Sequence, residues 1–200
     1  STEGGMGQSI MTKDTPPSET AKFTLLPVAK VLLPDGSREV VPGSGEVGMV
    51  AQGGMVPLGY YKDPEKSAKT FKEIDGTRYA FIGDMATIDA DGTINLLGRG
   101  SNCINTGGEK VFPEEVEEAL KLHPDVADAL VFGLEDERFG NRVAGVVSLE
   151  QGGTAEAGDI LEATRKLLAS YKLPKDLLVV PVVPRAPNGK ADYKTAKSMM

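Results

Sequence analysis

Short apolar runs separated by turn residues fill the chain from Phe23 to Val50. The punctuation consists of Pro34-Asp35-Gly36 and Pro42-Gly43-Ser44-Gly45, which are compositions typical of tight turns. This pattern predicts antiparallel strands joined by tight turns. Residues 11–22 are polar and contain two prolines, so we expect a connecting loop before the first of these strands.

Two further local signals lie before residue 100. Asp63 followed by Pro64 has the form of an N-cap with proline at the first helical position, which predicts a short helix ending near Phe71. Asp89-Ala90-Asp91-Gly92 separates two apolar segments and predicts a hairpin turn. The spacing of a calcium-binding loop is absent there, so the paired acids are interpreted as turn residues.

After Arg99 the pattern changes. Gly100-Ser101-Asn102 is short, small and polar, as in a hinge or domain boundary. A strand or hairpin comes next, and Pro113 then begins a helix with Val116, Ala119 and Leu120 on one face and glutamates on the other. The remaining pattern predicts strands at 126–132, 143–149 and 177–183, with a helix at 159–169 whose inward residues are Ile160, Thr164, Leu167 and Leu168. Pro181 indicates that the last strand lies at an edge.

Composition narrows the class of protein. The chain has 200 residues, of which 40% are hydrophobic and 26% charged, enough for one or two globular domains. The net charge of −7, the lack of Trp and the few aromatic residues argue against a nucleic-acid partner. No apolar run reaches the roughly 18 residues of a membrane span. One cysteine, Cys103, cannot form an internal disulfide and fits a reducing, cytoplasmic compartment.

The segment Pro184–Lys190, here called the lysine turn, reads Pro-Arg-Ala-Pro-Asn-Gly-Lys. Its two prolines and its Asn-Gly pair predict an irregular turn that carries Lys190 near its tip. A lysine in this setting suits contact with a phosphate or carboxylate better than burial in a core. The alternative is a solvated surface lysine.

Several motifs accompany the lysine turn. In chain order they are Ser1-Thr2-Glu3-Gly4, Gly45-Glu46-Val47, Gly59-Tyr60-Tyr61, Ile82-Gly83-Asp84, Gly98-Arg99 and Gly107-Gly108-Glu109-Lys110-Val111-Phe112-Pro113-Glu114-Glu115. In this order and at these spacings, the set resembles the C-terminal part of the adenylate-forming superfamily of acyl-CoA synthetases, luciferase and peptide-synthetase adenylation domains. The resemblance extends over essentially the whole chain.

The resemblance assigns roles at the nucleotide. Thr2 would contact the adenylate phosphate, and Glu3 would bind the Mg²⁺ that accompanies ATP. Asp84 would accept hydrogen bonds from both ribose hydroxyls, since a carboxylate matches a vicinal diol. Arg99 would also reach the nucleotide. The family usually has polar residues where this chain has Phe81-Ile82, which puts secondary contacts in doubt.

The resemblance also assigns roles after Arg99. Lys190 would be the catalytic lysine of adenylation, and Gly107-Gly108 would line the tunnel for the pantetheine arm of coenzyme A. Ser101 stands where the family normally has an Asp or Lys hinge, so a hinge survives without its charge. Lys172 could meet coenzyme A phosphates, although we interpret it as solvated. Cys103 and His123 have no partners at catalytic or metal spacing, and we assign them no function.

The expected fold class is α/β (α+β). Residues 1–98 would be the end of a large AMP-binding domain with β-barrel-like antiparallel strands. Residues 99–200 would be a small mobile domain with a short sheet flanked by helices. Because Ser1 falls inside a family motif and the family's phosphate loop is absent, we expect the C-terminal piece of a longer enzyme, inactive alone.

The implied activity of the longer enzyme is an AMP-forming acid–thiol ligase. It would convert a fatty acid or related carboxylic acid to a coenzyme A thioester through an acyl-adenylate, using ATP and Mg²⁺. Two alternatives stay open: transfer of the acyl group to a carrier protein, and a non-catalytic interaction module. The resemblance further implies a protein acetyltransferase as a partner that modifies Lys190.

Overall fold

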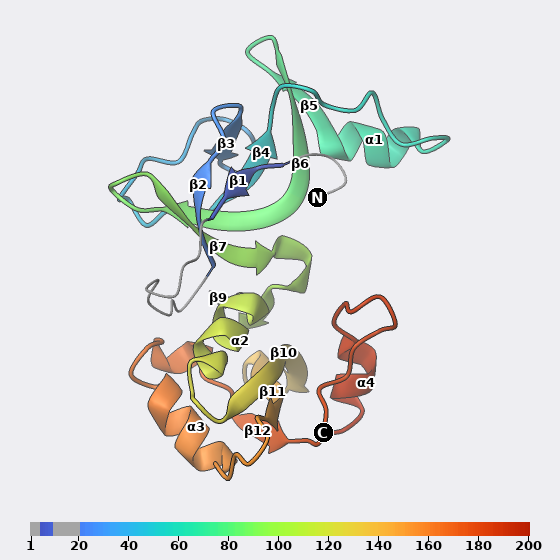
Figure 1. Ribbon diagram of the computed structural model, residues 1–200. Coiled ribbons are helices and arrows are strands. Elements are labelled where there is room, and N and C mark those ends of the chain that lie inside the picture. Colours follow the sequence, from blue (N-terminus) through green and yellow to red (C-terminus); the bar gives the residue numbers. More distant parts are fainter. Residues whose placement is uncertain (1–4, 10–20) are drawn as a thin grey trace. The chain divides into compact units, whose positions relative to one another are not determined.

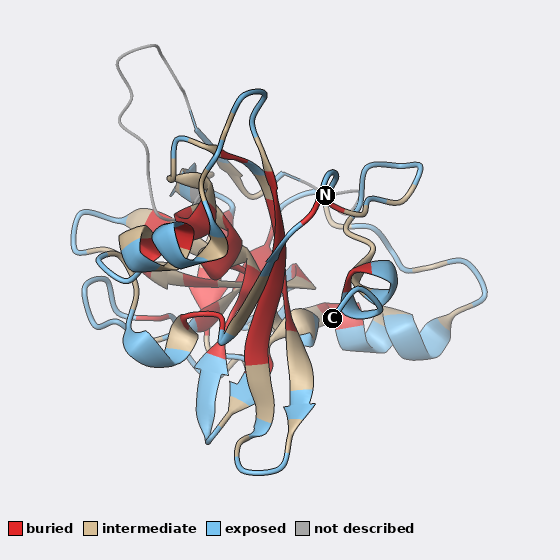
Figure 2. Ribbon diagram, turned by 90° about the horizontal axis from the view of Figure 1, so that it is seen from below, coloured by how far each residue is buried: buried red, intermediate tan, exposed pale blue. Residues whose placement is uncertain are grey.

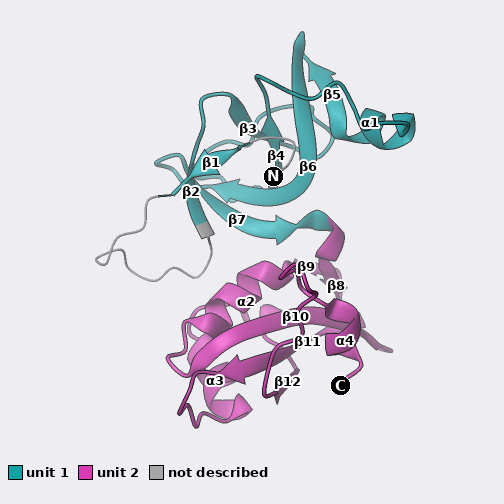
Figure 3. Ribbon diagram, turned by 45° about the vertical axis from the view of Figure 1, so that its right-hand side comes forward, with its two compact units in different colours: residues 1–15, 21–100 teal, residues 16–20, 101–200 magenta. Residues whose placement is uncertain are grey.

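The computed structural model describes residues 5–9 and 21–200, and it divides the chain into two compact units (Figure 3). Among the described residues, the first unit ends at Gly100 and the second begins at Ser101. Both units combine strands with helices, so the mixed α/β fold class expected from the sequence is confirmed. The assignment of the units to a large and a small domain, at residues 1–98 and 99–200, stays a prediction.

The first unit is one antiparallel sheet. Its strands are β1 (Gly7–Gln8), β2 (Ala21–Leu25), β3 (Ala29–Leu32), β4 (Gly48–Gln52), β5 (Phe71–Ile74), β6 (Thr77–Ile88) and β7 (Thr93–Arg99). The spatial order is β1-β2-β7-β6-β4-β3, with β5 also paired to β6. Figure 1 shows β6 as a long curved strand, and β6 pairs with β4, β5 and β7 along its length. The sheet is therefore curled, in agreement with the β-barrel-like strands expected from the family resemblance.

The local signals of the first half give the expected elements. Helix α1 spans Pro64–Thr70, and the Asp63 carboxylate accepts a hydrogen bond from the Lys66 amide at 2.9 Å. The turn between β6 and β7 closes through Asp89, whose amide donates to the Thr93 carbonyl at 2.8 Å. Strand β3 pairs with β4, while β2 pairs with β7. Most of the loop expected at 11–22 lies outside the described residues, and β2 begins at Ala21.

The residues described in the second unit form two small sheets, three α-helices and the 3-10 helix Ser170–Lys172. Its elements are β8 (Ile104–Thr106), β9 (Glu109–Val111), α2 (Pro113–Lys121), β10 (Val126–Asp136), β11 (Gly140–Leu149), α3 (Ala157–Thr164), β12 (Asp176–Val179) and α4 (Tyr193–Lys197). Strands β8 and β9 form a hairpin, and β10, β11 and β12 form a sheet in that order. Strand β12 runs parallel to β11 at the edge.

The hairpin of β10 and β11 is buried on both faces. Because side chains alternate along a strand, Val131 and Val147 face one cluster with α2 and α3, while Phe132 and Val146 face another with α4. On α2, Val116 and Leu120 are fully buried. Each such side chain stabilises the fold by about 1.5–3 kcal/mol relative to exposure. Figure 2 shows this burial in red along the central strands, whereas α1 is largely exposed.

Several expectations for the second half need correction. The glutamates of α2 do not form a solvent-facing side, because Glu117 is buried and the Glu115 side chain is only 14% exposed. Helix α3 ends at Thr164, so Leu167 and Leu168 lie beyond it and are half-buried. Strand β12 ends at Val179, and Pro181 follows the strand instead of lying within it. Helix α4 was not expected. In the part of the chain that the structure describes, no helix has the length and apolarity needed to cross a membrane.

Candidate functional site

Asp84 and Arg99 are brought together in the first unit. They are directly paired in the register of β6 and β7, and Nε of Arg99 lies 2.9 Å from Oδ1 of Asp84. A second hydrogen bond of 2.7 Å runs from Nη1 of Arg99 to the Ile82 carbonyl. The Asp84 side chain is 14% exposed and the Arg99 side chain 51%. The strand pairing thus holds the carboxylate against one edge of the guanidinium.

Irregular backbone surrounds this pair. Gly83 and Gly98 have positive φ angles of 92° and 116°, which L side chains rarely adopt. The register between β6 and β7 also shifts after Met85, because Gly98 pairs with Met85 while Leu96 pairs with Ala86. Such a bulge bends the strand and redirects its side chains. The sequence Ile82-Gly83-Asp84 therefore has a structural reason to carry glycine beside Asp84.

Gly107 and Gly108 form the two-residue turn of the β8–β9 hairpin. Their φ angles of 58° and 91° are both positive, and Thr106 pairs with Glu109 across the turn, as in a type I′ hairpin. The Gly107 amide donates to the Phe139 carbonyl at 2.9 Å. A Cβ at Gly107 would lie 3.1 Å from the Phe139 ring, whereas a Cβ at Gly108 would meet nothing within 4 Å. Gly108 thus leaves its backbone accessible to a ligand.

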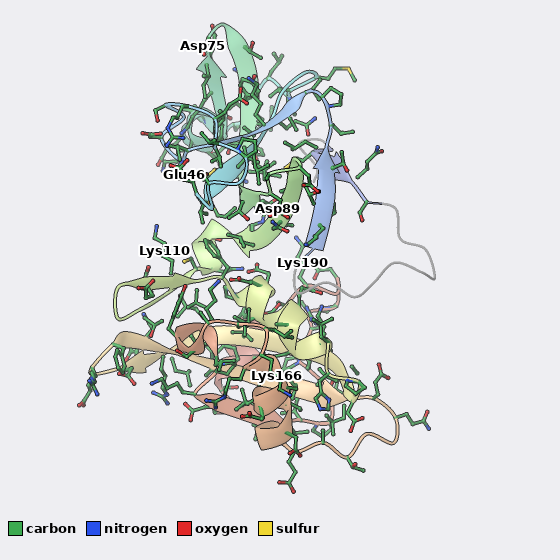
Figure 4. The ribbon with its side chains drawn as sticks, turned by 90° about the vertical axis from the view of Figure 1, so that its left-hand side faces the viewer. Glu46, Asp75, Asp89, Lys110, Lys166 and Lys190 are labelled. Atoms are coloured by element: carbon green, nitrogen blue, oxygen red, sulfur yellow. The ribbon has the colours of Figure 1, made fainter. Side chains whose placement is uncertain are left out.

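The lysine turn is a hairpin with defined geometry. The Gly189 amide donates to the Ala186 carbonyl at 2.8 Å, and the Ala186 amide donates to the Lys190 carbonyl at 2.8 Å. Gly189 has a positive φ of 78°, and Asn188 Oδ1 accepts from the Lys190 amide at 3.2 Å. These bonds form a three-residue turn that needs glycine at its third position. Lys190 follows that glycine and is exposed (Figure 4).

The lysine turn is attached at both ends to the second unit. Near its start, Nε of Arg185 lies 3.0 Å from Oδ2 of Asp128, and Nη2 of Arg185 lies 2.6 Å from Oδ1 of Asp128. After it, Asp192 caps helix α4 through its bond to the Thr195 amide at 3.0 Å. Arg185 and Asp128 were missed by sequence reasoning, because the two residues are 57 positions apart and nothing local predicts their pairing.

Glu117 and Tyr193 were also missed, and both interact electrostatically with Arg185. The Val131 amide donates to Oε1 of Glu117 at 2.9 Å. Burial raises the pKa of Glu117 to about 7, while the bond from Val131 acts in the opposite direction. Burial also raises the pKa of Tyr193, and the nearby carboxyls of Glu117 and Glu114 raise it further. Glu117 occupies an apolar angular position on α2, a signal that helical periodicity could have supplied.

Thr2 and Glu3 lie outside the described residues, so the structure leaves their expected contacts with phosphate and Mg²⁺ untested. Within residues 5–9 and 21–200, no group of three or more His, Cys, Asp or Glu side chains could hold a metal ion. The Mg²⁺ expectation therefore continues to rest on Glu3 and the family resemblance.

The structure also places the three residues to which the sequence assigned no function, Lys172, Cys103 and His123. Lys172 is not solvated as expected, since its Nζ lies 2.6 Å from Oε1 of Glu115 and its side chain is 21% exposed. Cys103 is half-buried and lies just before β8, and burial raises the pKa of its thiol. His123 Nδ1 accepts from the Asp125 amide at 3.2 Å just beyond α2.

Ser101 lies at the junction of the two units, in the short 3-10 helix Gly100–Asn102. It is exposed, and its Oγ lies 3.5 Å from Oδ1 of Asn102. Asp84 and Arg99 belong to the first unit, and Gly107, Gly108 and Lys190 to the second. Hinges usually lie in short connections of this kind, and the hinge at Ser101 stays a prediction.

Comparison with known proteins shows which family the chain resembles. A family model described as "AMP-binding enzyme C-terminal domain" matches residues 115–190, a range that ends at Lys190. The chain is 47% identical over 194 residues to 3-oxocholest-4-en-26-oate–CoA ligase from Rhodococcus rhodochrous, covering 97% of this chain and 34% of the relative. The chain belongs to the adenylate-forming superfamily.

Further proteins similar to the chain support this assignment. A medium/long-chain-fatty-acid–CoA/3-oxocholest-4-en-26-oate–CoA ligase from Mycolicibacterium smegmatis is 52% identical over 169 residues, covering 84% of this chain and 31% of that protein. Among solved structures, apo MatB from Rhodopseudomonas palustris gives a TM-score of 0.76 at 31% identity, covering 98% of this chain and 38% of MatB. The chain thus corresponds to about one third of the length of the adenylate-forming enzymes it resembles.

Proposed function

We propose that this chain is the C-terminal part of an ATP-dependent acyl-CoA synthetase. The longer enzyme would join a carboxylic acid to coenzyme A through an acyl-adenylate. The observation that carries the proposal is the identity of 47% over 194 residues with a CoA ligase. The exposed lysine turn and the Asp84–Arg99 pair supply groups suited to the first half-reaction.

In the first half-reaction, a carboxylate oxygen attacks the α-phosphorus of ATP, and the bond from that phosphorus to pyrophosphate breaks. Lys190 would stabilise the negative charge that develops between the carboxylate and the α-phosphate. Asp84 would hold the ribose hydroxyls, and Arg99 would keep the Asp84 carboxylate oriented through their 2.9 Å contact. Mg²⁺ on Glu3 and the phosphate contact of Thr2 belong to the same proposal.

In the second half-reaction, the sulfur of coenzyme A attacks the acyl carbon, and AMP leaves. We expect rotation about Ser101 to withdraw Lys190 and to bring the β8–β9 hairpin to the reacting groups. The backbone at Gly108 would lie against the pantetheine arm, since a Cβ there would meet nothing within 4 Å. One small domain would thus serve both half-reactions in turn.

The acid would be an apolar one. The relatives' names include 3-oxocholest-4-en-26-oate and medium- and long-chain fatty acids, so we propose a fatty acid or a steroid side-chain acid. Fatty-acid metabolism is the corresponding process. The test is an assay of the full-length enzyme against short, medium and long fatty acids and a steroid acid. Coenzyme A and phosphopantetheinyl carrier protein would be offered as rival acceptors.

The expected result is thioester formation with coenzyme A and with acids of the apolar classes. Faster transfer to carrier protein would favour the alternative acceptor. Absence of both adenylate and thioester with every acid would leave the interaction module as the better account.

We also propose that acetylation of Lys190 switches the first half-reaction off. The lysine side chain is exposed on a hairpin, where a protein acetyltransferase could reach it, and acetylation removes its charge. Mass spectrometry after treatment with such an enzyme should find Lys190 modified. Modification of other lysines with Lys190 unmodified would contradict the proposal that an acetyltransferase acts on Lys190.

A reducing cytoplasm is the compartment in which we expect the enzyme.

A further inference from the structure

The guanidinium of Arg185 is fixed by two parallel contacts with one carboxylate. Its Nε and Nη2 lie 3.0 and 2.6 Å from the two oxygens of Asp128, and Nη2 lies 3.5 Å from the Ala129 carbonyl. A bidentate pair of this kind fixes direction as well as distance, because the donors form a rigid planar fork. Arg185 also pairs with Ala191 in an isolated antiparallel bridge across the lysine turn.

Asp128 is a fixed partner. It lies on β10 directly after an irregularity in the register with β11, and its Oδ1 accepts a hydrogen bond of 2.8 Å from the Ala129 amide. Burial would raise the pKa of Asp128, but its bonds to Arg185 and Ala129 outweigh that effect and lower the pKa. The carboxylate therefore stays charged at neutral pH. The residues that follow Asp128 on β10, from Ala129 to Phe132, are buried.

The other end of the lysine turn is fixed independently. The Asp192 amide donates to the Pro184 carbonyl at 3.2 Å, and Asp192 then caps α4. Helix α4 is anchored by Ala196, which is fully buried, and by Tyr193, which packs against the same cluster. Between these attachments the turn from Ala186 to Lys190 has bonds only within itself among those the structure gives.

We propose that Arg185 is a positioning residue for Lys190, holding the lysine turn at a fixed angle to β10 through its bidentate pair with Asp128. The inference rests on the proposed role of Lys190 in adenylation. The pair is about one third exposed, with side-chain exposures of 35% and 31%. A pair at that exposure contributes less to folding stability than a buried pair, because solvent screens it. Its main effect would be on the position of Lys190, because stabilisation of a transition state depends on the exact position of the charged group.

The chain contains a matched control. Arg142 and Asp176 form an ion pair in the same unit, with Nε 2.6 Å from Oδ2 and exposures of 34% and 44%. That pair joins β11 to β12, and neither residue is bonded to the lysine turn. Arg142→Gln therefore removes a pair of similar length and exposure without changing the support of Lys190.

The first test measures position directly. Backbone ¹⁵N order parameters would be determined for this 200-residue chain and for its Arg185→Gln, Arg185→Lys and Arg142→Gln variants. Arg185→Gln should lower the order parameters of Gly189 and Lys190 from the range of rigid backbone, about 0.85, toward about 0.6. Arg185→Lys should give intermediate values, and Arg142→Gln none of this change. Unchanged values for Gly189 and Lys190 in Arg185→Gln would overturn the proposal.

The second test measures the half-reactions of the full-length enzyme. Arg185→Gln and Asp128→Asn should each slow acid-dependent pyrophosphate exchange at least tenfold at saturating ATP, with KM for ATP little changed. The double variant should be no slower than the slower single variant, since both remove the same contact. Thioester formation from synthetic acyl-adenylate should stay within about twofold of wild type. Arg142→Gln should leave both rates unchanged.

The outcomes separate this inference from the function on which it rests. If Lys190→Ala leaves pyrophosphate exchange intact, the role of Lys190 is wrong, and the positioning role in catalysis is wrong with it. If Lys190→Ala abolishes exchange while Arg185→Gln behaves like Arg142→Gln, only the positioning role is overturned. Equal loss of both half-reactions in Arg185→Gln would indicate general damage to the domain and would also contradict the inference.

Discussion

Asp84 and Arg99 stand opposite each other on β6 and β7, joined by a 2.9 Å contact from Nε to Oδ1. Both residues were predicted to meet the nucleotide, and the strand register places them together in one unit. Because the guanidinium is also bonded to the Ile82 carbonyl at 2.7 Å, it can hold the carboxylate in one orientation. The pair is therefore expected to act on the nucleotide as one group.

Asp84→Asn should weaken the use of ATP in the full-length enzyme. The amide has one acceptor oxygen in place of two and cannot attract Arg99 as a carboxylate does. We expect KM for ATP to rise about tenfold, because hydrogen bonds that involve a charged group are worth about 1.5–3 kcal/mol. KM for coenzyme A should not change. The measurement is the steady-state rate against each substrate.

Arg38→Gln is the control for this prediction. Arg38 forms an ion pair with Glu46 in the same unit, with Nη2 2.5 Å from Oε1. Its loss should leave KM for ATP unchanged. An equal rise in both variants, or an unchanged KM in Asp84→Asn, would show that Asp84 does not hold the nucleotide.

Ser101→Pro should impair thioester formation more than adenylation. Proline fixes φ near −65° and restricts the preceding Gly100, so it limits rotation at the junction between the units. Ser101→Ala keeps that freedom and should behave like wild type. The two half-reactions would be measured separately, by pyrophosphate exchange and by thioester formation from synthetic acyl-adenylate. Equal losses in both would place the pivot elsewhere.

The stability of the chain should carry a pH signature of Glu117. The pKa of this buried carboxyl is raised to about 7 in the folded state, from an ordinary value of 4.5. The folded state therefore holds the proton more tightly, and stability falls as pH rises from 4.5 to 7. The loss over this window should be about 2–3 kcal/mol. The charged and titratable groups that face Glu117 are Glu114, Lys121, Arg185 and Tyr193.

Glu117→Gln should remove this dependence, since its amide carbonyl can still accept from the Val131 amide and it cannot ionise. Between pH 4.5 and 7, the difference in free energy of unfolding between the variant and wild type should shift in favour of the variant as pH rises. Glu118→Gln, on the same helix with a side chain 40% exposed, should show no such trend. Carboxyl ¹³C shifts would report the titration directly, and a Glu117 midpoint near 4.5 would contradict the prediction.

The elements that could be predicted from sequence are those whose signals are local. Asp63-Pro64 opens α1, and Gly107-Gly108 and Asp89–Gly92 close hairpins, because cap and turn chemistry acts over a few residues. Helix α4 begins with the same kind of signal, since Asp192 caps it through Thr195. It was missed because five residues give too little periodicity to support a helix.

What sequence could not give is the long-range pairing. Arg185 meets Asp128 across 57 positions, and Lys172 meets Glu115 across 57 as well. Neither contact follows from spacing, because each depends on how strands and helices pack. Glu117 is different, since it lies four residues after Pro113 and three before Leu120 on the buried face of α2. Its chemistry as a glutamate suggested solvent, and its position in the helix required burial.

The most direct test of the account is the separate measurement of both half-reactions in the Lys190→Ala variant of the full-length enzyme. The Lys190 side chain is exposed, and the hydrogen bonds of the turn are made by its backbone. Replacing the side chain with that of alanine should therefore leave the melting temperature nearly unchanged. Pyrophosphate exchange should fall by about 10²–10³, the usual cost of removing one preorganised group at a developing charge. Thioester formation from synthetic acyl-adenylate and coenzyme A should proceed at a near-normal rate. Unchanged pyrophosphate exchange, or equal loss in both half-reactions at an unchanged melting temperature, would contradict the role assigned to Lys190.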